Sequence, residues 1–157
     1  MSDAPRAADL VLGGWNFSGI GTFATGFPFT VSIPVDRANI GTGGQRPNVV
    51  GDWRVSGQTI FRWFNPDAFA LPAELTFGSA GRNILRGPKY TNIDFSIAKR
   101  FITFEKQFVE FRCEMFNSTN TPSFSLPSAT INTPAIGRIF GVANPARQVQ
   151  FALRYEF

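Results

Sequence analysis

The last ten residues of the sequence alternate strictly between apolar and polar side chains. From Gln148 to Phe157, one row contains Val149, Phe151, Leu153, Tyr155 and Phe157, and the residues between them form a polar row. Successive side chains of a β-strand point to opposite faces of a sheet. This period of two therefore predicts a strand with one apolar and one polar face.

Three other parts of the sequence carry the same period. It predicts strands at about 90–101 and 107–116, joined by a short turn at 102–106, and an earlier run at about 13–33. Gly26 and Pro28 interrupt this earlier run, so it is either two strands or one long bent strand. No window has a helical period. We expect an all-β fold, with about four long strands in an antiparallel meander.

Two long segments, 34–89 and 117–147, lack a strand pattern and are rich in glycine, proline, asparagine and hydroxyl residues. Connections of this length are uncommon in an ordinary compact domain. Short turns at one end of the strands and long loops at the other are typical of outer-membrane β-barrels. We therefore expect residues 1–157 to form part of a transmembrane β-barrel, with both long loops extracellular.

The alternation does not say which face is inside. In a soluble sandwich the apolar row faces a protein core, whereas in a membrane barrel it faces lipid and the polar row faces a wet lumen. Charges of both signs along the polar row, aromatic residues near the ends of the apolar row and strands of about ten residues favour the barrel. A soluble all-β domain remains the alternative.

The barrel interpretation assigns a side to each residue of the three clearest strands. The predicted lumen-facing row consists of Asn92, Asp94, Arg100, Glu110, Arg112, Glu114, Gln148, Gln150, Arg154 and Glu156. The predicted lipid-facing row consists of Ile93, Phe95, Ile97, Val109, Phe111, Met115, Val149, Phe151, Leu153, Tyr155 and Phe157. Strand parity also suggests that Asp94 lies near Arg112.

The amino-acid composition excludes most common kinds of catalytic site. The chain has no histidine and a single cysteine, Cys113, which removes histidine-based catalytic systems and cysteine-based metal clusters. Glu110 and Glu114 lie about 13 Å apart along a strand, too far for a glycosidase pair. Arg112 between them indicates a charge ladder instead. We expect no enzyme activity, no cofactor and no catalytic or metal-binding residue.

Neither the net charge nor the aromatic residues of the first loop alter the predicted fold or indicate another function. The net charge is +4, but the arginines are scattered rather than gathered in a patch, so we expect no nucleic-acid partner. Residues 1–12 lack the apolar segment of an export signal. Either the chain stays in the cytoplasm, or this is not the native start of an exported protein. Loop self-packing is the favoured role of Phe61, Trp63, Phe64 and Phe69, with ligand contact as the alternative.

Six segments in order carry a resemblance to a known family. They are GGWNFSGIGTFATGFPFTV from Gly13, RPNVVGD from Arg46, WFNPDAFALP from Trp63, TFGSAGRNILRGPKYTNIDFSIAKRF from Thr76, VEFRCEMFNSTNTPSF from Val109 and GRIFGVANPARQVQFALRYEF from Gly137. Together they resemble the C-terminal barrel segment of a TonB-dependent outer-membrane receptor, of the Oar-like branch with a carboxypeptidase-regulatory-like domain. The alternate apolar residues Phe151, Leu153, Tyr155 and Phe157 resemble the signal that the barrel-assembly machinery recognises.

The resemblance implies a location, partners and a function. It implies the bacterial outer membrane, with membrane lipid, the rest of the barrel and the internal plug of a parent receptor as partners. Contact with TonB would come only through segments outside this sequence. Receptors of this kind have 22 strands around a plug, so about four strands make this sequence a fragment of the wall or one of several copies sharing a barrel.

Three function hypotheses follow. The first is the C-terminal wall of a TonB-dependent transporter that imports a bulky ligand, of siderophore or oligosaccharide type, only within the full protein. The second is a self-assembling β-protein whose copies share one barrel or fibre. The third is a soluble β-sandwich binding module.

Overall fold

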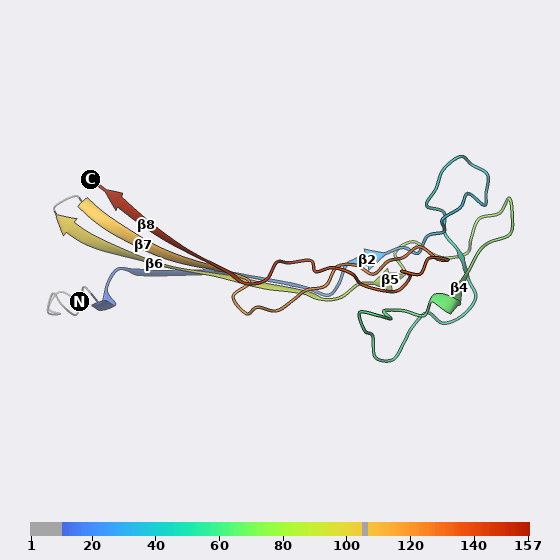
Figure 1. Cartoon of the computed structure of the whole chain (residues 1–157), viewed down its shortest axis with the longest axis horizontal. Helices are drawn as coiled ribbons and strands as arrows, with labels where there is room; N and C mark the ends of the chain where they lie inside the picture. The colour runs from blue at the N-terminus through green and yellow to red at the C-terminus, as the bar shows by residue number, and fades with distance from the viewer. Residues whose placement is uncertain (1–10, 105–106) are drawn as a thin grey trace. The chain divides into compact units, whose positions relative to one another are not determined.

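The computed structural model describes residues 11–104 and 107–157. Four long strands form one antiparallel sheet in the order β1-β6-β7-β8 (Figure 1). Their bounds are Trp15–Ala24 for β1, Tyr90–Phe104 for β6, Gln107–Phe116 for β7 and Gln148–Glu156 for β8. The expected all-β meander is confirmed. The expectation about an export signal rests mainly on residues 1–10, which lie outside the described residues.

The register of the sheet follows from the alternation. Cys113 of β7 lies opposite Ile97 of β6 on one side and opposite Phe151 of β8 on the other. Residues of equal parity therefore share a face across all three strands. One face of the sheet carries the apolar rows and the other carries the polar rows.

The connection between β6 and β7 is tighter than the sequence pattern suggested. Ile102 pairs with Phe108 and Phe104 pairs with Gln107, with a register shift between the two pairs. Residues 102–104 thus belong to β6 rather than to a turn. The remainder of the predicted turn, residues 105–106, lies outside the described residues.

The early run of apolar residues is two strands rather than one bent strand. β1 ends at Ala24, and β2 covers only Pro28–Phe29. Between them, Gly26 has φ of +97°, and a Cβ atom there would collide with the carbonyl oxygen of Gly87. Only glycine fits both the left-handed backbone and this close approach. The chain therefore leaves the sheet at this point.

The described residues of the sheet form no hydrophobic core of their own. None of the buried hydrophobic residues of the described chain lies in β1, β6, β7 or β8. On β8, Phe151 is 70% exposed and Leu153 is 75% exposed. No helix within the described residues is long and apolar enough to cross a membrane.

The remaining residues fold into a second unit with a core. This loop unit comprises Ala24–Tyr90 and Ser123–Ala143, and the sheet unit comprises the rest of the chain. β2 pairs with β5 (Leu85–Arg86), and β3 (Asn48–Val49) pairs with β4 (Phe69–Ala70), which follows the short 3-10 helix η1 (Pro66–Ala68) (Figure 1). The segments without a strand pattern are therefore not structureless.

Aromatic rings build the centre of the loop unit. Phe64 is 1% exposed and lies 6.0 Å from Phe29 and 5.9 Å from Phe69, measured between ring centroids. The other buried hydrophobic members of this cluster are Val31, Ile33, Ala68, Ala80, Leu85 and Ile131.

Backbone hydrogen bonds join the two segments of the loop unit. The Ser32 amide donates to the Ala129 carbonyl, and the Ile131 amide donates to the Ser32 carbonyl, both at 2.9 Å. Residues some hundred positions apart in sequence are thus tied together. The tie and the shared core hold the two loops in one body.

The loop aromatics have separate environments. Trp63 is half-buried and donates from Nε1 to the Arg86 carbonyl at 2.8 Å. Phe61 is 67% exposed, in a tight hairpin where Thr59 and Arg62 exchange backbone hydrogen bonds. Self-packing is therefore the role of Phe64, Phe69 and Trp63, but not of Phe61.

Candidate functional site: the two faces of the sheet

A ladder of alternating charges lies across the polar face of the sheet. Glu110 of β7 is opposite Arg100 of β6 and Arg154 of β8. Its carboxylate accepts hydrogen bonds from Arg100 at 3.3 Å and from Arg112, on its own strand, at 2.7 Å. Arg112 also lies 3.8 Å from the Glu114 carboxylate. The charges of both signs offset one another on this face.

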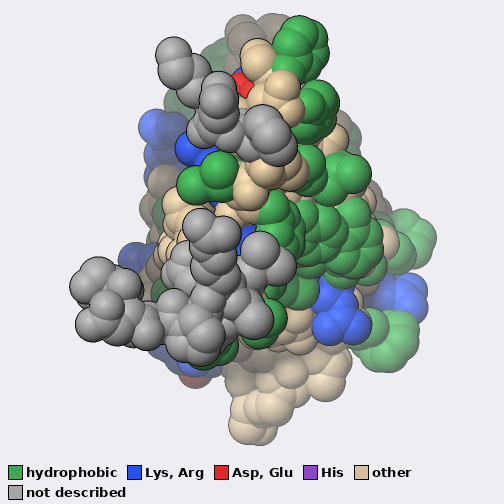
Figure 2. Space-filling model, turned by 90° about the vertical axis from the view of Figure 1, so that its left-hand side faces the viewer, with side chains coloured by type: hydrophobic (Ala, Val, Ile, Leu, Met, Phe, Trp, Pro, Cys, Tyr) green, Lys and Arg blue, Asp and Glu red, His purple; other side chains and the backbone are tan. Residues whose placement is uncertain are grey.

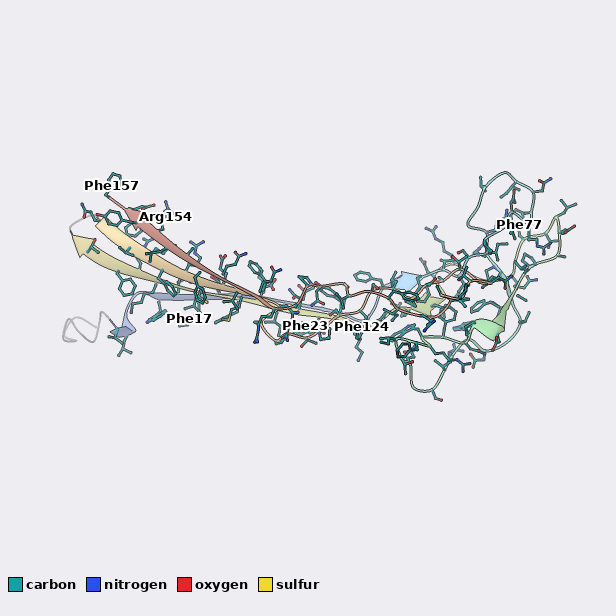
Figure 3. The ribbon with its side chains drawn as sticks, in the orientation of Figure 1. Phe17, Phe23, Phe77, Phe124, Arg154 and Phe157 are labelled. Carbon is teal, nitrogen blue, oxygen red and sulfur yellow. The ribbon has the colours of Figure 1, made fainter. Side chains whose placement is uncertain are left out.

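The ladder continues at the edge strand and is rimmed by an aromatic contact. Arg154 pairs with Glu156 on β8. The Arg100 guanidinium also lies 4.2 Å from the centroid of the Phe108 ring, within the range of a cation–π contact. Figure 3 shows Arg154 on β8, close to Phe157 at the end of the chain. The ladder thus extends across β6, β7 and β8.

The expected proximity of Asp94 and Arg112 is wrong. Arg112 lies opposite Ala98, and continuing the same register places Asp94 four positions further along β6. Asp94 instead accepts hydrogen bonds from the Asn92 side chain and the Asn117 backbone amide, both at 2.9 Å. The two side chains share a face, as their parity requires, but they do not meet.

The Asp94 side of the polar face contains a shallow hollow of about 250 Å³ between β1, β6 and β7. Asp94 and Glu114 contribute acidic groups to its wall, and Ile20 and Phe116 contribute apolar surface. The described residues contain no group of three or more His, Cys, Asp or Glu side chains able to hold a metal ion.

The apolar face carries a row of aromatic contacts. The Phe17 and Phe95 rings stack at 6.4 Å across β1 and β6, and the Phe111 and Phe151 rings stack at 6.1 Å across β7 and β8. Figure 2 shows hydrophobic side chains gathered side by side on the surface at this end of the chain. Most of these rings remain accessible, because no second layer of the described chain covers them.

Lys99 is the residue of this face that pattern reasoning missed. It shares the parity of Ile97 and Phe101, yet it is only 4% exposed. Its ammonium lies 4.6 Å from the Trp15 ring centroid and 5.1 Å from that of Phe101, and donates to the Val11 carbonyl at 2.8 Å. Its place in the apolar row could have been found from parity alone. Its contacts with Trp15 and Val11 could not, because they depend on how β1 and the residues before it are placed beside β6.

Polar and aromatic groups lie on this face toward the end of the sheet where β6 ends and β7 begins. Trp15 donates from Nε1 to the Val11 carbonyl at 2.9 Å, and the Tyr155 hydroxyl bonds to the Gln107 side chain at 2.9 Å. Tryptophan, tyrosine and long cationic side chains are favoured at the boundary between lipid and water. The pattern therefore matches one end of a membrane-spanning band.

These features define a class of protein. A single-layer antiparallel sheet with an accessible apolar face, an aromatic rim and a charged opposite face is the wall of an outer-membrane β-barrel. The chain belongs to the family described as outer membrane beta barrel domain, whose model matches residues 1–150. The family indicates an outer-membrane location. Comparisons with curated proteins and with solved structures gave no match.

Proposed function

We propose that this chain is the C-terminal part of the wall of a TonB-dependent transporter in the bacterial outer membrane. In this proposal the apolar face of the sheet contacts lipid and the charged face lines the lumen. The carrying observation is the uncovered apolar face, on which Phe151 and Leu153 are 70% and 75% exposed. Exposure of this kind is unfavourable in water and favourable in lipid.

The two open edges of the sheet favour the proposal that these strands belong to a barrel with more strands. Among residues 11–104 and 107–157, β1 and β8 are the outer strands, and each has one neighbour in the sheet. Unpaired backbone N–H and C=O groups in lipid cost several kcal/mol each, and four tilted strands are too few to close around a lumen. Further strands, from a parent receptor, would pair with both edges.

The imported ligand in this proposal is bulky, of siderophore or oligosaccharide type. In this proposal the loop unit lies outside the membrane, and its hydrophobic core holds together the loop segments that would contact such a ligand. The plug and the TonB-contact segment belong to other parts of the parent protein. The barrel-assembly machinery recognises the apolar row of Phe151, Leu153, Tyr155 and Phe157.

The single cysteine offers a direct test of the face assignment. Cys113 lies in the apolar row opposite Phe151, whereas the next position, Arg112, lies opposite Ala152 in the polar row. A nitroxide label on Cys113, with the chain in detergent micelles, should collide mainly with dissolved oxygen, which concentrates in the apolar phase. The same label on Ala152→Cys, in a Cys113→Ser background, should collide mainly with a water-soluble nickel chelate.

Equal access of both labels to the nickel chelate would contradict the assignment. A monomer that stays soluble without detergent would contradict it too, because the apolar face would then be covered by protein. The open edges equally favour a second candidate, in which copies of the chain share one barrel. Light scattering in detergent separates the two: a discrete multimer supports shared barrels, and its absence supports a parent receptor.

A further inference from the structure

A groove on the loop unit lies between the loop of residues 36–45 and the segment of residues 77–82. Its volume is about 510 Å³. Among the side chains and backbone that line it are Thr42, Gly43, Gly44, Arg46, Phe77 and Arg82. Phe77, labelled in Figure 3, is 70% exposed. The groove thus combines two cationic side chains, an aromatic ring and open backbone.

Arg46 and Arg82 differ from the other arginines of residues 11–104 and 107–157. Each of those others has an acidic, amide, carbonyl or aromatic partner. Arg46 and Arg82 have no side-chain hydrogen bond, ion pair or ring contact within this described part. Both line the same groove. Their guanidinium donors are therefore available to an external group.

The backbone beneath these side chains is held firmly. Gln45 is buried, accepts from the Ala38 amide at 3.0 Å and bonds to Asp36, which closes the loop preceding Arg46. The Asn83 amide donates to Thr30 at 2.9 Å, next to Arg82.

The segment that carries Phe77 is anchored as well. A Cβ atom on Gly78 would collide with the Arg46 carbonyl oxygen, so the two backbones are in close contact. The Ala80 amide donates to the Pro47 carbonyl at 2.9 Å. The anchored backbone limits the ordering cost of binding to the side chains of the groove.

Gly43 lines this groove and has open space beside it. No atom lies within 4 Å of the position that a Cβ would occupy there, and its φ is not in the left-handed region. Neither packing nor backbone conformation therefore requires glycine at this position. A side chain there would occupy the open space beside the arginines.

The charge of the loop unit points to the class of ligand. Within its bounds, the sequence has eight arginine and lysine residues and four acidic ones, whereas the sheet unit has seven of each. The whole net charge of +4 thus lies on the loop unit. Such a field attracts anions, and guanidinium groups match carboxylate and phosphate oxygens in geometry.

We propose that the groove binds an anionic ligand, with Arg46 and Arg82 holding its carboxylate or phosphate groups and Phe77 covering its apolar part. The proposal deepens the transport function and rests on it for the site's place outside the membrane. It narrows the imported ligand to an anionic one. Binding itself needs neither a closed barrel nor TonB.

Calorimetric titration of the full chain in zwitterionic detergent tests the proposal. The probes are trigalacturonate for carboxylates, pyrophosphate for phosphates and maltotriose as a neutral sugar. We expect one of the two anions to bind and maltotriose not to bind. The ratio of the two anion affinities identifies the preferred group. Arg46→Gln with Arg82→Gln should weaken binding at least tenfold, and Gly43→Leu should block it without changing charge.

Arg54→Gln is the control for loss of a positive charge outside the groove, and it is compared with Arg46→Gln and Arg82→Gln made singly. Arg54 lies in the loop unit, is exposed and pairs with Asp52 outside the groove, so its replacement removes one positive charge without touching the site. Near-ultraviolet circular dichroism checks that each variant keeps its fold. Equal weakening by Arg54→Gln, equal binding of maltotriose or no anion binding at all would overturn the site. The label test on Cys113 would be unaffected, so the two proposals fail separately.

Discussion

The loop unit buries large hydrophobic side chains in a core, whereas the described residues of the sheet unit include no buried hydrophobic side chain. In the loop unit Phe29, Phe64 and Phe69 are at most 7% exposed and pack against one another. In the sheet unit Phe17 and Phe151 are 62% and 70% exposed. The same residue type thus supports a protein core in one unit and presents an apolar surface in the other. The loop unit stabilises itself, whereas the sheet depends on its surroundings.

The two units also differ in how they handle charge. On the sheet, carboxylates and guanidinium groups alternate and satisfy one another, as in the contacts of Glu110 with Arg100 and Arg112. The loop unit has a surplus of positive charge, and the side chains of Arg46 and Arg82 have no hydrogen bond, ion pair or ring contact with the described residues. A balanced wall suits a channel lining, and an unbalanced surface suits the capture of a ligand.

The largest effect is expected from opening the core of the loop unit. Phe64→Ala should destabilise this unit by about 3–5 kcal/mol, because it leaves a cavity among Phe29 and Phe69. Trp53, which stacks on Phe69 at 6.2 Å, reports the transition. Urea titration of tryptophan fluorescence in a Trp15→Phe background, which removes the sheet's tryptophan, should show a lower midpoint.

Phe61→Ala is the control for this experiment. Phe61 is 67% exposed and outside the core, so its truncation should change stability by about 0.5 kcal/mol or less. Equal effects of the two substitutions would contradict the view that the loop unit has an independent core. If the Cys113 label kept its accessibility in Phe64→Ala, the sheet would not depend on that core.

The sheet could be predicted from sequence because its information is local. Alternation over ten residues, as from Gln148 to Phe157, depends on neighbours in the chain. The loop unit could not be predicted in this way. Its core joins residues near Val31 to residues near Ile131, and no period links segments so far apart. The two segments look irregular separately because each supplies half of one structure.

The sequence predicts which face of the sheet each residue of the candidate site lies on, but not which residues lie opposite one another on neighbouring strands. Alternation places Asp94, Arg112 and Glu110 on one face, and the structure agrees. Which of them meet depends on the tight connection after β6, where the register shifts between Ile102 and Phe104. Alternation does not encode such a shift. The groove at Arg46 and Arg82 could not be predicted from the sequence either, because the residues that line it come from separate loop segments.

A smaller effect is expected from neutralising the ladder. Glu110→Gln leaves Arg100 and Arg112 facing a neutral amide, so their mutual repulsion is no longer offset. The urea midpoint of the sheet, followed by far-ultraviolet circular dichroism in detergent, should fall at low salt. The loss should shrink in 1 M salt, because screening weakens the repulsion. It should stay well below the effect of Phe64→Ala, since both arginine side chains are about half exposed and ion pairs of exposed groups contribute little.

Glu156→Gln provides the matched comparison for the ladder. Glu156 pairs with Arg154 on its own strand and lies at the edge of the sheet. Its replacement should lower the midpoint less than that of Glu110, which joins two arginines. A loss in Glu110→Gln that persists unchanged in 1 M salt would show that the carboxylate acts through packing rather than charge.

The smallest effect concerns the pH response of the loop of residues 36–45. Desolvation raises the pKa of Asp36, but hydrogen bonds from the Gly41 and Ile40 amides and the Gln45 side chain outweigh it and lower the pKa. The carboxylate therefore stabilises the loop above its unfolded pKa, and this is lost as pH falls below roughly 4. The protection factor of the Gly41 amide, which is the ratio of its intrinsic exchange rate to its observed exchange rate, should fall there. Asp36→Asn should abolish this step, whereas Asp67→Asn should retain it. A step unchanged in Asp36→Asn would assign the response to another group, and the sheet unit should show no matching change in either variant.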